Sequence, residues 1–220
     1  MRYTTLAPGP DFRHELEIRR SRFITVLRRV EDEEAARALV AELRREFHDA
    51  RHHCSAFILG PDRMAQRSND DGEPSGTAGI PMLEALVRRE THDGEADLSD
   101  VCAVVVRYFG GILLGAGGLV RAYSDSVSQA LDAAPLVARR RLRLGAVSAG
   151  FGEAGKLENE FRSAGLTVVT TEYGSSEAAI VLAFDDSPAE HERVGSLVAG
   201  HSMGRASIQP RGTRWIDLPR

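Results

Sequence analysis

The chain has 220 residues, of which 42% are apolar and 27% charged, and its formal net charge at pH 7 is −4. This composition is typical of a globular protein with one large or two small domains and argues against a disordered chain. The net negative charge argues against a protein that coats nucleic acid indiscriminately, because that mode of binding needs many positive charges to neutralise phosphates.

The start of the sequence has no apolar run of the kind found in signal peptides. No later apolar stretch reaches the roughly 18 residues that a membrane span requires. We therefore expect a cytoplasmic protein without a membrane segment. The two cysteines, Cys54 and Cys102, each lie in an apolar, strand-like run, so we expect buried free thiols rather than a disulfide or a zinc site.

The first predicted elements are strands followed by a helix. Two short β-prone runs, at residues 16–18 and 23–27, flank a group of arginines and predict a hairpin or two successive strands. Residues 32–48 begin with acidic residues and repeat an apolar residue every four positions, which predicts an amphipathic helix. Residues 53–59 alternate and end at a Gly-Pro turn, which predicts another strand.

The next segment, residues 68–81 (SNDDGEPSGTAGIP), is polar and has no apolar periodicity. We expect it to be a loop that leads into a helix near Met82. The continuous apolar run at 100–109 has the length and β-branched character of a central strand. After a glycine-rich stretch, residues 119–131 repeat at helical spacing until a proline ends the pattern, so the first domain is expected to end at residue 136.

The remaining residues restart the pattern as strand, helix, strand, strand, helix and strand. This βαββαβ order is that of the ferredoxin-like motif, in which two helices cover one face of a four-stranded antiparallel sheet. The predicted fold class is therefore α+β. We expect a first domain at residues 1–136 and a ferredoxin-like C-terminal domain at residues 137–220.

The acidic loop at residues 68–81 is the first candidate site. Its three carboxylates precede a Ser/Gly/Thr stretch at a helix entry, and such a loop could hold Mg²⁺ on the acids and an anion on the backbone amides. Alternatively, the aspartates form Asx-type turns, Thr77 caps the helix and the glycines supply unusual backbone angles. The candidate binding residues of this loop are Asp70, Asp71, Glu73, Ser75 and Thr77.

The glycine-rich stretch after the predicted central strand is the second candidate site. Its backbone amides, at the start of a helix and with an arginine on either side, could bind an anion. It is not a dinucleotide-binding fingerprint, because the G-x-G-x-x-G spacing is absent. Tight packing would require the same glycines, so that explanation stays open. The candidate residues are Arg107, Tyr108, Gly110, Gly111, Gly115, Gly117, Gly118 and Arg121.

Other clusters give weaker signals. His52 and Cys54 could face the same side of a strand, but two ligands are too few for a metal site, and no Ser/His/Asp arrangement is visible. We therefore predict no catalytic residue, no metal and no cofactor. Arginines gather at residues 139–143 and 19–29. They form either a phosphate-facing patch, if the fold brings them together, or a solvated linker and strand edge.

Two long blocks, SNDDGEPSGTAGIPML and VVVRYFGGILLGAGGLVRAYSDSV, closely resemble the IMPACT/YigZ family, and SRFIT and DARHHCSAF extend the resemblance to most of residues 15–134. Asn69 departs from the pattern, since relatives often have serine there. The resemblance implies an N-terminal domain similar to ribosomal protein S5 domain 2 and a C-terminal domain similar to a ferredoxin-like elongation-factor domain. Eukaryotic relatives regulate translation by competing for an activator of a stress kinase, but that partner is not carried over to this chain.

These observations lead to three hypotheses about function. The first is a non-enzymatic, translation-associated regulator that binds RNA, the ribosome or a translation factor. The second is a Mg²⁺-dependent enzyme that processes phosphate esters or nucleotides with the acidic loop and the glycine loop. The third is a protein-interaction role for the exposed sheet of the C-terminal domain.

Overall fold

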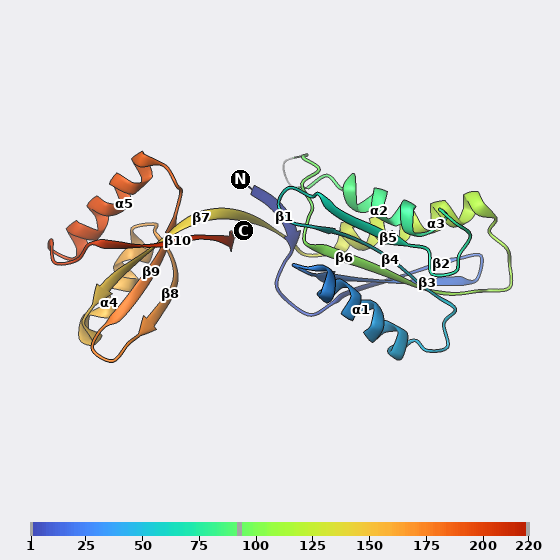
Figure 1. The fold of residues 1–220 in the computed structure, drawn as a ribbon, viewed down its shortest axis with the longest axis horizontal. Coiled ribbons are helices and arrows are strands. Elements are labelled where there is room, and N and C mark those ends of the chain that lie inside the picture. The colour runs from blue at the N-terminus through green and yellow to red at the C-terminus, as the bar shows by residue number, and fades with distance from the viewer. Residues whose placement is uncertain (1, 92–93, 219–220) are drawn as a thin grey trace. The chain divides into compact units, whose positions relative to one another are not determined.

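The computed structural model describes residues 2–91 and 94–218 (Figure 1). The chain divides into two compact units, residues 2–138 and residues 139–218. Each unit combines a sheet with helices, in agreement with the predicted α+β class. No helix in the described part of the chain is long and apolar enough to cross a membrane.

The first unit is built on an antiparallel sheet. Among the described residues its strand order is β2-β3-β6-β4-β5, so that β6 is central and β2 and β5 are the edges. A further short strand, β1, is held by backbone hydrogen bonds between Thr4 and residues Asp97 and Ser99. The strands are β1 (Arg2–Leu6), β2 (Phe12–Ile18), β3 (Ser21–Arg29), β4 (His52–Leu59), β5 (Ala65–Asn69) and β6 (Val101–Tyr108).

Helices cover both faces of this sheet, because its strands carry apolar side chains on both sides. Along β6, Val104 packs in the apolar cluster with α1 (Glu33–Glu46). Its neighbour Val105 packs in the cluster with α2 (Gly79–Val87) and α3 (Ala116–Ala133). This alternation is the two-residue period of a strand. The sheet therefore lies between α1 on one face and α2 and α3 on the other (Figure 1).

The local sequence explains several of these elements. The two strands β2 and β3 form the predicted hairpin, and its turn residues Arg19 and Arg20 have φ angles of 48° and 64°, as a two-residue turn with left-handed residues requires. Helix α1 begins after Asp32, whose side chain accepts the N–H of Ala35 at 2.7 Å, an N-cap contact. The sequence did not predict β5, whose residues are all exposed.

The second unit has the predicted βαββαβ order. Strand β7 lies between β10 and β9, and β8 pairs on the other side of β9, with every pair antiparallel. Phe161 and Val194, from the two helices of this unit, pack into one core with the sheet. The elements are β7 (Leu136–Ala149), α4 (Phe151–Ser163), β8 (Thr167–Tyr173), β9 (Ala178–Phe184), α5 (Pro188–His201) and β10 (Ile208–Asp217).

Candidate functional site

A buried ion pair joins the two sequence motifs inside the first unit. The Oε1 atom of Glu73 accepts hydrogen bonds from Nη1 of Arg107 and from the hydroxyl of Tyr123, both at 2.7 Å. The side chains of Glu73 and Arg107 are only 3% and 7% exposed. An unpaired charge at such depth is strongly disfavoured, so each ion fixes the position of the other. The pair therefore ties the acidic loop to β6 and α3.

Two residues of β4 hold the backbone of the acidic loop. The thiol of Cys54 donates to the carbonyl oxygen of Asp70 at 2.9 Å and lies 3.3 Å from the hydroxyl oxygen of Tyr123. Burial raises the pKa of Cys54 to about 12, so the sulfur stays protonated and remains a donor. Nδ1 of His52 lies 2.9 Å from the carbonyl oxygen of Asp71. The loop is thus fixed through its main chain as well as through Glu73.

The two cysteines are buried free thiols, as the sequence predicts. Cys102 packs in the apolar cluster around α1, and its burial also raises the pKa of its thiol to about 12. Neither thiol has the lowered pKa that makes a cysteine nucleophilic. Their roles in this structure are packing and, for Cys54, hydrogen bonding.

Asp70 caps the N-terminus of α2. Its carboxylate accepts the backbone N–H groups of Gly76, Ala78 and Gly79 at 2.8, 3.0 and 2.7 Å. Burial by itself raises the pKa of Asp70, but these three donors outweigh it and hold the pKa below its usual value. The carboxylate therefore stays ionised and complements the positive end of the helix.

The prediction that Thr77 caps α2 is wrong. Its Oγ1 donates instead to the carbonyl oxygen of Pro74 at 2.7 Å, which closes a turn within the loop. Ser75 is exposed and makes no side-chain hydrogen bond among the described residues. Gly79 is required for close approach rather than for an unusual backbone angle, because a Cβ there would lie 2.7 Å from the backbone nitrogen of Asn69.

The partners of Asp71 differ from those of Glu73 and Asp70. It forms an ion pair with Arg44 of α1 and accepts the backbone N–H of His53 at 2.6 Å. The three carboxylates of the loop therefore serve three different contacts and do not converge. Within residues 2–91 and 94–218 no group of three or more His, Cys, Asp or Glu is arranged to hold a metal ion. The geometry gives no support to the Mg²⁺ hypothesis, which stays a prediction.

The glycine loop (residues 109–115) lies against the turn of the β2–β3 hairpin. A Cβ at Gly110 would lie 2.0 Å from the backbone carbonyl carbon of Arg20. Nη1 of Arg19 donates to the carbonyl oxygen of Leu113 at 3.4 Å. Tight packing therefore explains Gly110, whereas the other glycines of the motif have a different environment.

These other glycines shape the entry to α3. Gly111 and Gly115 have φ angles of 85° and 72°, in the left-handed region that favours glycine. Gly115 is the N-cap of α3, and no side chain caps this helix. In the described part of the chain, the N–H groups of Ala116, Gly117 and Gly118 have no hydrogen-bond acceptor. The positive end of α3 therefore presents free amide donors.

Exposed aromatic and basic side chains lie around this loop. Phe109 is 47% exposed, and the guanidinium carbon of Arg107 lies 5.7 Å from the centroid of its ring. Arg20 and Arg121 are exposed and have no ion-pair partner among the described residues. We call the set of Arg20, Phe109, the first turn of α3 and Arg121 the glycine-loop surface.

Tyr108 does not belong to the glycine-loop surface. Its hydroxyl donates to Oδ1 of Asp49 at 2.7 Å, and the guanidinium carbon of Arg22 lies 5.6 Å from its ring centroid. Hydrogen bonding to Asp49 raises the pKa of Tyr108. Because neighbours on a strand face opposite sides, Tyr108 packs on the α1 side while Arg107 points to the other.

Sequence reasoning did not include Tyr123 or Cys54 among the site residues. Tyr123 follows the apolar spacing of α3, and both residues are fully buried. The sequence nevertheless contains a signal for Tyr123. The apolar spacing of α3 predicts that this residue is buried, and a buried tyrosine hydroxyl needs a hydrogen-bond partner. The candidate site is therefore a buried Glu73, Arg107 and Tyr123 contact beneath an exposed loop and helix N-terminus.

Comparison with known proteins shows which protein family the first unit resembles. The Impact N-terminal domain family matches residues 19–131, just over half of the chain, and this range includes both loops. The first unit is therefore an Impact-type domain, followed by a smaller α+β unit. The chain belongs to the IMPACT/YigZ family.

Individual relatives agree with this assignment. The chain is 48% identical over 149 residues to the IMPACT family member YvyE of Bacillus subtilis and 52% identical over 117 residues to the IMPACT family member YigZ of Escherichia coli. The alignment with YvyE covers 68% of this chain and 65% of that relative. The alignment with YigZ covers 52% of this chain and 54% of that relative. A crystal structure of a hypothetical protein is similar with a TM-score of 0.59 and 32% identity, covering 94% of this chain and 96% of that chain.

The buried pair gives a first prediction. Glu73→Ala leaves the charge of Arg107 buried without a partner, and we expect the free energy of unfolding to fall by about 3–5 kcal/mol. The double variant Glu73→Ala/Arg107→Met should lose less than the two single variants together. Urea unfolding followed by circular dichroism measures the losses. Tryptophan fluorescence serves as a control, because Trp215 is the single tryptophan and lies on β10 in the second unit, whereas the substitutions are in the first. Additive losses would contradict the predicted coupling.

The cap gives a prediction about pH. Since the pKa of Asp70 in the folded protein lies below its usual value of about 3.9, its stabilising effect is present above that pH and is lost as the pH falls through the folded pKa. Asp70→Asn removes the charge, and we expect it to cost about 1 kcal/mol at neutral pH. Thermal unfolding of both proteins at pH 7 and at about pH 2.5 tests this. If the difference in stability between the unchanged protein and Asp70→Asn is as large in acid as at pH 7, the prediction is wrong.

The glycines give a matched pair of variants. In Gly110→Ala the new methyl group collides with the backbone of Arg20, and we expect a loss of roughly 2–3 kcal/mol. Gly117→Ala makes the same chemical change in open space within a helix, and should be neutral or stabilising by up to about 1 kcal/mol. Melting temperatures measure both. Equal effects of the two substitutions would refute the close-approach explanation.

Proposed function

We propose that this chain is a non-enzymatic, cytoplasmic, translation-associated regulator that binds RNA through the glycine-loop surface. The observation that carries the proposal is the combination of free amides at the start of α3 with the unpaired arginines Arg20 and Arg121 and the exposed ring of Phe109. The bound RNA is either free or part of the ribosome. A translation factor is the alternative partner.

The chemistry of the glycine-loop surface matches the two parts of a single-stranded nucleotide. Free N–H groups at a helix N-terminus bind phosphate oxygens, and an arginine binds them with two parallel hydrogen bonds. Side chains on a helix lean toward its N-terminus, so Arg121 is directed toward the same end of α3 as the free amides. An exposed aromatic ring such as Phe109 provides a face for base stacking. The net charge of −4 fits a local contact of this kind better than an extended coating.

The fold adds support from the second unit. Its βαββαβ order, with β7 between β10 and β9, supports the ferredoxin-like assignment. For the first unit we propose the ribosomal protein S5 domain 2-like fold that the sequence resemblance implies. Both folds occur in proteins of translation, but a fold by itself is weak support for a function. The proposal therefore depends mainly on the glycine-loop surface.

The test is RNA binding measured against salt concentration. Arg20→Ala/Arg121→Ala removes two phosphate contacts, so the slope of log affinity against log salt for a single-stranded RNA should fall by about 1.4. Fluorescence anisotropy with a labelled oligonucleotide measures the slope, and co-sedimentation measures ribosome binding. Absence of RNA and ribosome binding at low salt, for the unchanged protein and the double variant alike, would refute the proposal.

Two further variants sharpen this test. Phe109→Ala should weaken binding by about 1–3 kcal/mol through lost stacking, with an unchanged salt slope. Arg45→Ala removes an arginine from the exposed side of α1, away from the glycine-loop surface, and should leave both quantities unchanged. If Arg45→Ala lowers the slope as much as the double variant does, binding is not localised at this surface.

A further inference from the structure

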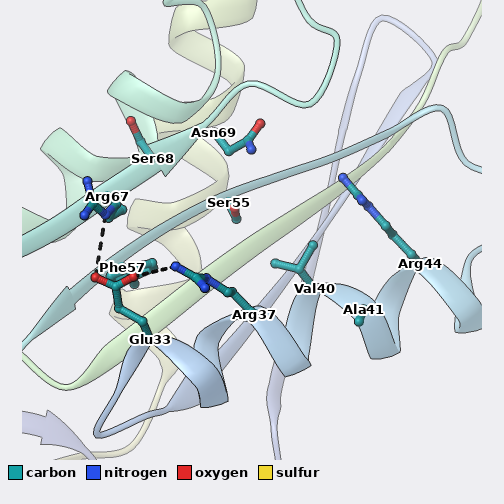
Figure 2. A pocket seen from close by; sticks show the side chains of 10 residues that line it. All are labelled: Glu33, Arg37, Val40, Ala41, Arg44, Ser55, Phe57, Arg67, Ser68 and Asn69. Carbon is teal, nitrogen blue, oxygen red and sulfur yellow. Dashed lines mark hydrogen bonds and ion pairs between the residues drawn. The ribbon is translucent and has the colours of Figure 1, made fainter.

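An open groove lies between helix α1 and the edge strand β5, on the face of the sheet opposite to α2 and α3 (Figure 2). Its volume is about 520 Å³, within the range of about 300–1,000 Å³ that small-molecule sites occupy. The groove exists because α1 is the helix of this face and covers only part of the sheet. The surface above β4 and β5 is left open.

One side of α1 forms a wall of this groove. The buried residues of the helix, Ala36, Leu39 and Leu43, lie on the face toward the sheet. A second stripe, displaced around the helix, has the spacing i, i+4, i+7, i+8 and i+11, which keeps residues on one side. This stripe faces the groove and consists of Glu33, Arg37, Val40, Ala41 and Arg44.

The groove has a surplus of positive charge. Nη2 of Arg37 lies 2.8 Å from one carboxylate oxygen of Glu33, and Nε of Arg67 lies 3.6 Å from the other (Figure 2). Two guanidinium groups from opposite walls therefore share one carboxylate. Their side chains are 77% and 69% exposed, so their remaining donors are accessible. Neither arginine has another acidic partner among the described residues.

The opposite side of α1 has no such surplus. There Arg13 forms a two-bonded ion pair with Glu46, and Arg28 is paired with both Asp11 and Glu42. Both of these arginines have at least one carboxylate of their own. The shared carboxylate at the groove is therefore a local feature and not a property of the whole helix.

The acidic sequence motif forms the far end of the groove. Its first two residues, Ser68 and Asn69, line the groove at the end of β5, and Asp71 fixes Arg44 on the other wall. The floor includes the apolar ring of Phe57 on β4, and Val40 adds an apolar side chain from the α1 wall (Figure 2). The groove thus combines guanidinium groups at its rim, an apolar floor and, at one end, the Ser55 hydroxyl and the Asn69 amide, which lie opposite each other on β4 and β5.

We propose that this groove binds an organic phosphate of nucleotide size. Arg37 and Arg67 bind the phosphate, because guanidinium groups match its geometry and supply the positive charge that Glu33 leaves uncompensated. The volume is far larger than a phosphate ion needs, and the organic part lies over Phe57. The side chain of Asn69 supplies hydrogen bonds to that part. This site is independent of the glycine-loop surface.

The test uses adenosine and guanosine 5′-monophosphates and 5′-diphosphates, with adenosine and inorganic phosphate as reference probes, in titration calorimetry of the full chain. We expect the nucleotides to bind saturably and more tightly than either reference. Arg37→Ala/Arg67→Ala should weaken binding by about tenfold or more for each guanidinium removed. Ala41→Trp fills the groove without changing its charge and should also abolish binding.

Two controls separate this site from others. Arg45→Ala, on the same helix but outside the groove, should leave nucleotide affinity unchanged. Arg20→Ala/Arg121→Ala disables the glycine-loop surface, and the groove should still bind the nucleotides saturably in this variant. A 5′-phosphorylated dinucleotide compared with its 5′-hydroxyl form tells whether the phosphate belongs to a free nucleotide or to an RNA end. No saturable binding of any phosphate probe, or equal affinity in Arg37→Ala/Arg67→Ala, overturns the proposal. If inorganic phosphate binds as tightly as the nucleotides, the apolar floor does not contribute to binding, and this part of the proposal is wrong.

Discussion

The contact of Glu73 with Arg107 and Tyr123 is the interaction on which both candidate surfaces depend. The acidic loop is polar, and little of it could be held by apolar packing, so a buried charge with fixed partners determines its position. Once it is fixed, Asp70 caps α2 and Asp71 holds Arg44 at the wall of the groove. On the other side, the guanidinium of Arg107 lies against the ring of Phe109. A single ion pair thus supports both the groove and the glycine-loop surface.

Elements with a clear burial pattern could be predicted from the sequence. Helix α1 (Glu33–Glu46) and the central strand β6 (Val101–Tyr108) were found because apolar residues recur at the spacing of a buried face. Strand β5 (Ala65–Asn69) was not, because it is an exposed edge held by backbone pairing to β4. Its sequence, AQRSN, carries no burial signal. An edge strand of this kind becomes visible only when its partner strand is in place.

The contacts of individual motif residues could not be predicted from their position in the motif. The loop aspartates were expected to share a function, but Asp70 and Asp71 have different partners, because the atoms they meet belong to segments far away in the sequence. Tyr108 and Arg107 were grouped as neighbours in a motif. The alternation of side chains along a strand separates them, and this rule was available from the sequence alone.

The distribution of arginines shows why charge density in a sequence is a poor guide to binding surfaces. In the densest run, residues 139–143, three arginines are matched by acids within the second unit: Arg139 pairs with Asp217, Arg140 with Asp185 and Arg143 with Asp186. Arg141 donates to the hydroxyl oxygen of Thr213 instead. At the glycine-loop surface Arg20 and Arg121 have no ion-pair partner among the described residues, and at the groove Arg37 and Arg67 share one carboxylate. A paired surface arginine contributes little field beyond its partner, whereas an unmatched one attracts anions. The phosphate binding that we propose for both surfaces therefore depends on tertiary pairing, which leaves surplus positive charge beside the two sequence motifs.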